Sequence, residues 1–181
     1  AAIAWVPVYL QRVHGYSTGE SGTILAIAIG LFGGLGTFFG GYFADRLARR
    51  NEGWRSWIVS LAALIYIPFG YLSLTAQDPF WAAAWFFGPA IFGGVYLGTN
   101  FAILQSQLPI EMRAVGAAIS LFVLNIIGLG LGPLSVGAIS DATAAADGID
   151  SIRNGLLAML FIMLWGAAHQ WRTGNLLSQN K

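Results

Sequence analysis

Side chains that could do chemistry are few in this 181-residue sequence, and nearly all of them lie outside its long apolar segments. Cysteine is absent, which excludes disulfides, thiolate metal sites and cysteine nucleophiles. The two histidines, His14 and His169, lie near segment ends, and every carboxylate lies at or beyond such an end. Because proton relays in membrane proteins use acids or histidines inside the spans, we expect any proton-coupling carboxylate in another part of the protein.

The serines inside the apolar segments give little support for hydrolytic chemistry. Ser60, Ser120 and Ser135 do not lie in a Gly-x-Ser-x-Gly run, and only His169 comes near them in depth. A channel is no better supported, because the sequence has no filter-like repeat or ring of charges. We therefore predict no catalytic residue, no cofactor and no metal site. An intramembrane enzyme and a non-transporting membrane scaffold are the alternative functions.

A charged run at residues 41–50 separates two long uncharged segments. Gly41 would let another helix approach closely where the segment leaves the membrane. Asp45 lies at the boundary, where it can accept hydrogen bonds from backbone donors or from a basic side chain. Three arginines of the run are suited to anionic headgroups: Arg46, Arg49 and Arg50. Membrane lipids are therefore predicted partners.

Composition places the elements that carry these residues in a membrane. Hydrophobic residues make up 56% and charged residues 9% of the chain, whereas a soluble domain carries about 25% charged residues. Five uncharged stretches are long enough to cross a bilayer as helices: about 23–44, 56–77, 79–109, 114–140 and 154–171. Residues 1–10 cover only about half a bilayer, so we expect the end of a truncated sixth helix there. The net charge of +1 gives no reason to expect a nucleic-acid partner.

Charge placement predicts the orientation. If the loop at 45–55 lies in the cytoplasm, alternation of the spans places two further segments there. They are the loop that contains Arg113 and the polar C-terminal tail, residues 172–181. Seven of the nine bases then lie inside: Arg46, Arg49, Arg50, Arg55, Arg113, Arg172 and Lys181. Only Arg12 and Arg153 lie outside, as expected when basic residues concentrate in cytoplasmic loops. The C-terminus is thus predicted to be cytoplasmic.

Glycine pairs inside the spans predict close helix packing. Gly36 and Gly40 are four residues apart, and the same spacing recurs at Gly94 and Gly98 and at Gly128 and Gly132. This spacing puts both glycines on one helix face, where a neighbouring helix can approach. The faces either pack statically or let helices slide during alternating access. Prolines inside spans, such as Pro133, are expected to kink them because a backbone donor is lost.

Four runs carry a resemblance to a known family. The run at 41–50 resembles the loop signature of the major facilitator superfamily, with Ala48 where the family usually has glycine. The run 108–114, which holds Glu111 and Arg113, is similar to the loop between the fourth and fifth helices of each superfamily half. Residues 125–141 and 12–17 resemble the C-terminal half of bacterial spinster-like transporters. The N-terminal half of the superfamily commonly carries an arginine in its fourth helix. The corresponding span here, 79–109, contains none, which also favours the C-terminal half.

The resemblance implies an all-α membrane protein. Residues 1–181 would form a six-transmembrane-helix bundle with a truncated first helix, half of a twelve-helix major facilitator fold in the bacterial inner membrane. Its function would be secondary active transport of a small organic or amphipathic solute by alternating access, with the missing N-terminal six-helix half as partner. Spinster-like relatives are associated with lysolipid or sphingolipid cargo.

Polar groups that are costly in lipid are the candidates for lining a substrate cavity. Asn100 and Asn125 lie deep in spans and are the strongest of them, although hydrogen bonding between helices explains both equally well. Four further candidates are Tyr96, Thr99, Trp5 and Tyr9.

Overall fold

The computed structural model describes residues 2–179, and every regular element it contains there is helical. The elements run in this order: α1 (Ala2–His14), α2 (Thr18–Ala26), η1 (Ile27–Gly33), α3 (Gly34–Ala48), α4 (Trp54–Thr75), α5 (Pro79–Gln107), η2 (Ile110–Met112), α6 (Arg113–Val123), η3 (Leu124–Leu131), α7 (Gly132–Asp147), η4 (Gly148–Asp150) and α8 (Ser151–Gln179). The segments η1 and η3 are π-helical, whereas η2 and η4 are short 3-10 turns. The predicted all-α fold class is confirmed.

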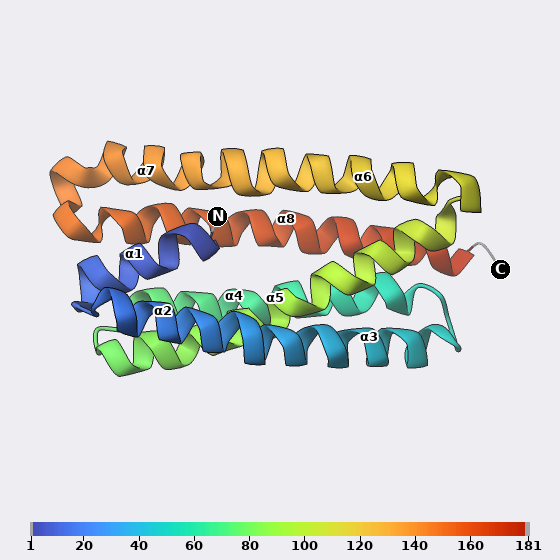
Figure 1. Ribbon diagram of the computed structural model, residues 1–181, viewed down its shortest axis with the longest axis horizontal. Helices are drawn as coiled ribbons and strands as arrows, with labels where there is room; N and C mark the ends of the chain where they lie inside the picture. The colour runs from blue at the N-terminus through green and yellow to red at the C-terminus, as the bar shows by residue number, and fades with distance from the viewer. Residues whose placement is uncertain (1, 180–181) are drawn as a thin grey trace.

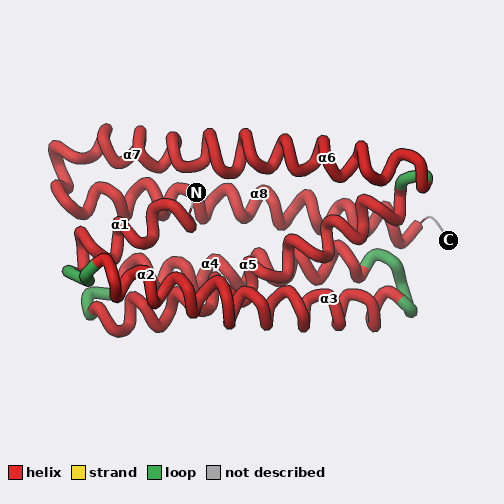
Figure 2. Tube along the Cα trace, viewed as in Figure 1, coloured by secondary structure: helices red, strands yellow, loops and turns green. Residues whose placement is uncertain are grey.

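These elements join into long rods that lie side by side, with α1 as a shorter helix at one end (Figure 1). Within the described residues, 4 helical stretches are long and apolar enough to cross a membrane, and the last runs from Ile110 to Gln179. That stretch reverses direction at Gly148, where φ is +55°, and therefore supplies two antiparallel rods. The loops are confined to the two ends of the bundle (Figure 2).

The two ends of the bundle differ in charge. The connections α1–α2, α4–α5 and α7–α8 meet at one end, and the connections α3–α4 and α5–α6 meet at the other (Figure 1). The first, which we call the acidic end, carries five carboxylates and two arginines: Glu20, Asp78, Asp141, Asp147, Asp150, Arg12 and Arg153. The second, the basic end, carries six arginines and three carboxylates: Arg46, Arg49, Arg50, Arg55, Arg113, Arg172, Asp45, Glu52 and Glu111. Lys181, also predicted on this side, lies outside the described residues.

The first full rod is longer than the uncharged stretch at 23–44 because of its cap. The rod extends over Thr18–Ala48. Its start is fixed by a capping box, in which the Ser17 hydroxyl accepts from the Glu20 backbone and the Glu20 carboxylate accepts from the Ser17 backbone. Because Glu20 is charged, the uncharged stretch read from the sequence starts only after it. In the structure the same residue lies in the first turn of the helix.

The segment 172–181, expected as a polar tail, differs from the prediction because α8 stays helical to Gln179. Helix α4 holds this extension in place. The indole N–H of Trp57 lies 3.2 Å from the Trp171 carbonyl oxygen and 3.1 Å from the Asn175 side-chain oxygen. The polar segment is therefore helical as far as Gln179 and makes polar contacts with a neighbouring helix.

The main core forms where α1 enters the bundle. Tyr9 and Leu10 are each 1% exposed. The buried cluster around them draws on η1, α4, α5, α7 and α8 and consists of Val6, Tyr9, Leu10, Ala28, Leu74, Phe86, Val136, Ile152, Leu156 and Leu160. Burial of these apolar side chains makes α1 the element that joins the rods near the acidic end.

Glycines bring α3 and α5 into backbone contact. A methyl group on Gly36 would overlap the Ile91 carbonyl, and one on Gly94 would overlap the Gly33 carbonyl. The Thr37 hydroxyl lies 3.0 Å from the carbonyl oxygens of both Gly33 and Gly94 and so bridges the two helices. Two other predicted packing positions also face the partner helix, Gly40 against Val95 and Gly98 against Thr37.

The third glycine pair behaves differently. A methyl group on Gly128 would meet no atom within 4 Å. Gly132 begins α7 and is half-buried. The close contact expected for this pair therefore stays a prediction.

Gly36→Ala tests the close approach of α3 and α5. The added methyl group would strike backbone atoms of Ile91, which cannot move aside as a flexible side chain can. We expect a loss of stability of about 1–3 kcal/mol. Gly34→Ala is the matched control, since it adds the same group to the same helix where nothing lies within 4 Å. Thermal unfolding in detergent measures both variants, and equal melting temperatures would contradict the close contact.

Candidate functional site

The rod formed by α6, η3 and α7 leaves most of its apolar surface uncovered. No residue of η2, α6 or η3 is buried. Its exposed large apolar side chains are Val115, Ile119, Leu121, Phe122, Val123, Ile126, Ile127, Leu129, Leu131 and Leu134. A continuous apolar surface of this kind marks contact with lipid or with another protein surface.

Two π-helical segments interrupt the rods near their middles. They are η1, between α2 and α3, and η3, between α6 and α7, and these two rods lie on opposite sides of the view in Figure 1. Pro133 follows η3 and lacks the N–H that would bond to the Leu129 carbonyl in a regular α-helix. Such segments are rare and often occur at functional sites. Neither segment was predicted from the sequence, although the glycines and the proline beside η3 were a signal.

Asn125 lies within η3 and is exposed. Its side-chain N–H donates to the Leu121 carbonyl of the preceding turn at 2.7 Å, and its side-chain oxygen has no partner among the described residues. A carbonyl oxygen left without a donor is costly in an apolar environment. Asn125 is therefore positioned to accept a hydrogen bond from outside this chain.

Asn100, in contrast, is part of a polar seam between three helices. The Gln170 side chain of α8 donates to the Asn100 oxygen at 2.9 Å and accepts from the Ser56 hydroxyl of α4 at 2.6 Å. Ser60 continues the seam by donating to the Ala167 carbonyl at 2.7 Å. Of the two explanations open for Asn100, this geometry favours hydrogen bonding between helices.

The other cavity candidates are scattered. Tyr96 is 45% exposed, whereas Thr99 is buried and its hydroxyl has no hydrogen-bond partner among the described residues. Tyr9 lies inside the bundle rather than on an open surface, and its hydroxyl is 3.1 Å from the Ser73 carbonyl oxygen and 3.0 Å from that of Leu74. Trp5 is half-buried between α1 and α7. The six candidates thus do not form one site within this chain.

The acidic end holds a titratable contact next to Tyr9. The Tyr9 hydroxyl and the His14 Nε2 atom are 2.9 Å apart, and the two rings meet edge to face. Burial holds the pKa of His14 below its ordinary value, and the Arg153 charge acts in the same direction. The carboxylates of Asp150 and Asp78 oppose this effect. Neutral His14 is therefore the form that the packing at the end of α1 favours.

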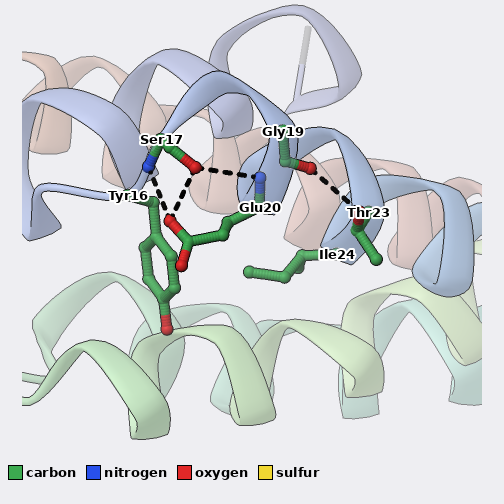
Figure 3. A pocket seen from close by; sticks show the side chains of 6 residues that line it. All are labelled: Tyr16, Ser17, Gly19, Glu20, Thr23 and Ile24. Carbon is green, nitrogen blue, oxygen red and sulfur yellow. Dashed lines mark hydrogen bonds between the residues drawn. The ribbon is translucent and has the colours of Figure 1, made fainter.

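A cavity of about 540 Å³ opens beside the start of α2 (Figure 3). The run 15–19 around it has the Gly-x-Ser-x-Gly spacing, which makes Ser17 the one serine here that resembles a hydrolase nucleophile. The Ser17 hydroxyl instead donates to the Glu20 carboxylate at 2.7 Å, and Thr23 bonds to the Gly19 carbonyl within the same helix. The polar groups shown here cap the helix, so this cavity is not a catalytic site.

A second cavity of about 640 Å³ lies between α1 and α7. We call it the α1–α7 groove; its lining consists of Ala4, Trp5, Val8, Pro133, Leu134, Gly137, Ala138 and Asp141. Two residues predicted from the sequence, Trp5 and Pro133, meet here, because the indole N–H donates to the Pro133 carbonyl at 2.9 Å. Asp141 is the only ionisable residue in the lining.

The charged run 41–50 at the basic end forms an ion pair with an arginine that lies outside the run. Asp45 forms an ion pair with Arg55 of α4, which also pairs with Glu52 at 3.0 Å. A methyl group on Gly41 would meet nothing within 4 Å, so its smooth surface faces away from this chain's other helices. The remaining arginines of the run are exposed and form no ion pair among the described residues: Arg46, Arg49 and Arg50.

The turn between α5 and α6 carries the second charged motif. The Arg113 side chain donates to the Leu108 carbonyl at 3.3 Å, which caps the end of α5. Glu111 lies in η2 and is exposed. The described residues include no group of three or more His, Asp or Glu side chains that could hold a metal ion.

The family model described as Major Facilitator Superfamily matches residues 1–133. This chain belongs to the major facilitator superfamily. A curated relative, an MFS-type efflux pump of Mycolicibacterium smegmatis, is 32% identical over 166 residues, which are 91% of this chain. The superfamily predicted from the charged motifs is confirmed, and with it the assignment to an integral membrane protein.

A solved structure supports the same fold. It is a bacterial homologue of the human lysosomal transporter Spinster, in an inward-facing and occupied conformation. The match covers 97% of this chain at a TM-score of 0.76 and 20% sequence identity. The chain spans 38% of the length of the curated relative and 45% of that solved chain, as a partial major facilitator fold does. The matched proteins are transporters and not enzymes.

Asn100→Ala and Gln170→Ala test the polar seam. Each change leaves a polar group without its partner across the helix interface, so both should lower stability, with a coupling of about 1 kcal/mol between them. Asn125→Ala is the control, because its amide bonds only to its own helix, and we expect a change within about 0.5 kcal/mol. Thermal unfolding of the single and double variants in detergent gives the coupling, and strictly additive effects would exclude the direct contact.

His14 predicts a pH dependence of stability. Because its pKa is lowered in the folded protein, its contribution is complete above about pH 6.5, the ordinary histidine value, and is lost as pH falls through the lowered pKa. The melting temperature should therefore fall as the pH is lowered below about 6.5. His14→Gln keeps a donor for Tyr9 without titrating and should flatten this profile.

Proposed function

We propose that this chain is the C-terminal bundle of a secondary transporter that moves a small organic or amphipathic solute across the membrane by alternating access. The observation that carries the proposal is the uncovered apolar rod of α6, η3 and α7, with the unsatisfied Asn125 oxygen in its π-helical middle. A rod that faced only lipid would have no use for that polar group. A rod that faces a substrate path would.

A second bundle is the proposed cover for these surfaces. The length of the matched relative and of the matched structure leaves room for another bundle of similar size. It would pack against the rods that contain η1 and η3, including the aromatic side chains exposed along α3: Phe38, Phe39, Tyr42 and Phe43. Substrate would then lie between the bundles near the bilayer midplane, with Asn125 in the wall formed by this chain.

The difference in charge between the two ends supports the proposed orientation. The basic end, with its unpaired arginines of the 41–50 run, would face the cytoplasm, and the acidic end would face the other side. In a bacterial inner membrane the exposed arginines would meet anionic headgroups. The end of α8 lies at the basic end (Figure 1), so the C-terminus would be cytoplasmic.

The relatives bear on the solute and on the direction of transport. The name of the curated relative, an efflux pump, supports export. The structural likeness to the Spinster homologue supports the fold. The described residues of this chain hold no acid or histidine in the middle of a rod, so coupling to a proton gradient would depend on residues of the second bundle.

Transport by the full-length protein in proteoliposomes tests the proposal. We expect gradient-stimulated movement of at least one member of a panel of lysophospholipids, hydrophobic cations and hydrophobic anions, and about a tenfold loss in Asn125→Ala, the cost of roughly one hydrogen bond to substrate. Thr75→Ala is the control, since its hydroxyl also bonds only within its own helix but lies in α4. An Asn125→Ala protein as active as wild type would remove Asn125 from the path, and inactivity toward the whole panel would contradict transport of this class of solute.

A further inference from the structure

The side chain of Gln170 joins three helices in the half of the bundle nearer the basic end. Its N–H donates to the Asn100 side-chain oxygen of α5 at 2.9 Å, and its oxygen accepts from the Ser56 hydroxyl of α4 at 2.6 Å. That hydroxyl also lies 2.7 Å from the Gln170 backbone carbonyl oxygen. Ser56 is in the first turn of α4, and Asn100 is in the last two turns of α5. Gln170 therefore ties the basic ends of α4 and α5 to α8.

An ion pair extends this series of contacts to α3. Arg55 precedes Ser56 in α4 and pairs with Asp45 of α3. Arg55 also pairs with Glu52 at 3.0 Å, so its guanidinium is held by carboxylates from both sides of the α3–α4 connection. The polar contacts thus continue from α3 through α4 and α8 to α5, and every helix in the series is joined to the next by a side chain.

The end of α8 lies directly against the start of α4. A methyl group on Gly53 would lie 2.5 Å from the Gly174 carbonyl oxygen, and one on Gly174 would overlap the Trp57 ring. The Trp57 indole N–H bonds to the Trp171 carbonyl and to the Asn175 side chain. Close backbone approach and hydrogen bonds thus hold these two ends together, so the amide of Gln170 reaches α5 from a fixed pair of helices.

Helix α6 has no comparable tie at this end. None of its residues is buried. Among the described residues, no side-chain hydrogen bond or ion pair joins α6 to α3, α4 or α8. Its start is linked to α5 by the Arg113 side chain, which donates to the Leu108 carbonyl in the adjoining turn. The basic end thus consists of four helices joined by polar contacts and of α6, which lies outside the series.

The polar contacts oppose separation of α5 from α8. Such a movement would deprive the Asn100 oxygen and the Gln170 N–H of their partners. Lipid offers neither a donor nor an acceptor in exchange, so both groups would be left unsatisfied. Movement of α6 away from α8 breaks no side-chain hydrogen bond among the described residues. The two movements therefore differ in what they cost.

We propose that Gln170 is a positioning residue, which holds the basic ends of α3, α4, α5 and α8 together as one body while α6 moves against that body. Gln170 acts through Asn100 and Ser56 and touches no solute. The proposal rests on the proposed function, because alternating access supplies the movement in which the body stays intact. It predicts that α5 and α8 keep one separation at the basic end in every state of the transporter.

Distances between spin labels test the proposal without requiring transport. This chain has no cysteine, so labels are attached in the full-length protein after replacement of any cysteine outside the chain. Gln105→Cys with Leu176→Cys, both at exposed positions, reports on α5 and α8, and Ala118→Cys with Leu176→Cys reports on α6 and α8. Double electron–electron resonance in detergent should give a single narrow distance for the first pair and a broader distribution for the second.

Gln170→Met keeps the length of the side chain but loses both hydrogen bonds, so it should broaden the α5–α8 distance or add a second one. Asn100→Leu removes only the contact with α5 and should have the same effect, which keeps the test informative if Gln170→Met does not fold. Thr173→Val is the matched control on α8, because the Thr173 hydroxyl bonds only to the His169 carbonyl of its own helix. It should leave the distance unchanged. Circular dichroism and melting temperature show that each variant is folded.

A cleavable crosslink tests the same body during transport. Asn100→Cys and Gln170→Cys are combined and joined by a short bifunctional thiosulfonate, and uptake of radiolabelled lysophosphatidylcholine into proteoliposomes is measured. Before linking, loss of the contact should slow uptake about fivefold, within the range for mutations that alter coupling between parts of a protein. Linking should restore uptake, and reduction of the linker should slow it again. A residue needed only for folding would not give this reversible change at constant protein content.

Four outcomes would overturn the proposal. They are equal widths for the two label pairs, an unchanged α5–α8 distance in Gln170→Met and Asn100→Leu, uptake that stops when the crosslink forms, and failure of the crosslink to form. The distances do not depend on transport, so the two proposals fail separately. A protein that moves no solute but shows the expected distances contradicts only transport. A protein that moves the lysolipid with α5 and α8 separating contradicts only the role of Gln170.

Discussion

Polar groups inside the apolar rods must find hydrogen-bond partners within the protein, since lipid offers none, and much of the bundle is built around this constraint. Ser56, Ser60 and Ser73 each use a hydroxyl to reach a carbonyl on another helix. Thr37 does the same between α3 and α5, where glycines allow the backbones to touch. Small polar side chains and glycines together therefore determine which rods pack closely. The bulky apolar side chains are left to face outward.

Where the constraint is not met, the structure indicates contact with something else. The Asn125 oxygen is the clearest case, because it lies on a rod whose central part has no buried residue. Asp141 is the equivalent at the acidic end, where every other carboxylate has a partner. Both residues lie on the rod formed by α6, η3 and α7. That rod is thus the part of the chain whose chemistry is directed away from its own bundle.

The sequence predicted the helical fold and the superfamily, because long uncharged stretches and charged loop motifs are local patterns. It could not distinguish Asn100 from Asn125, since both are amides deep in apolar segments and only the packing shows that Gln170 lies beside one of them. The π-helical segment η3 was missed because it depends on how the backbone bonds shift around Pro133, whereas η1 has no proline beside it. Asp141 was counted only as an outer charge, because its lack of a partner is a property of three-dimensional arrangement.

Helix α1 contacts both α7 and α4. Trp5 and Tyr9 lie four residues apart, about one helical turn. The Trp5 indole bonds to the Pro133 carbonyl in the first turn of α7. The Tyr9 hydroxyl bonds to carbonyls in the last turn of α4. Since the Tyr9 hydroxyl is also the partner of His14, the contact that positions α1 is the one next to a titratable group.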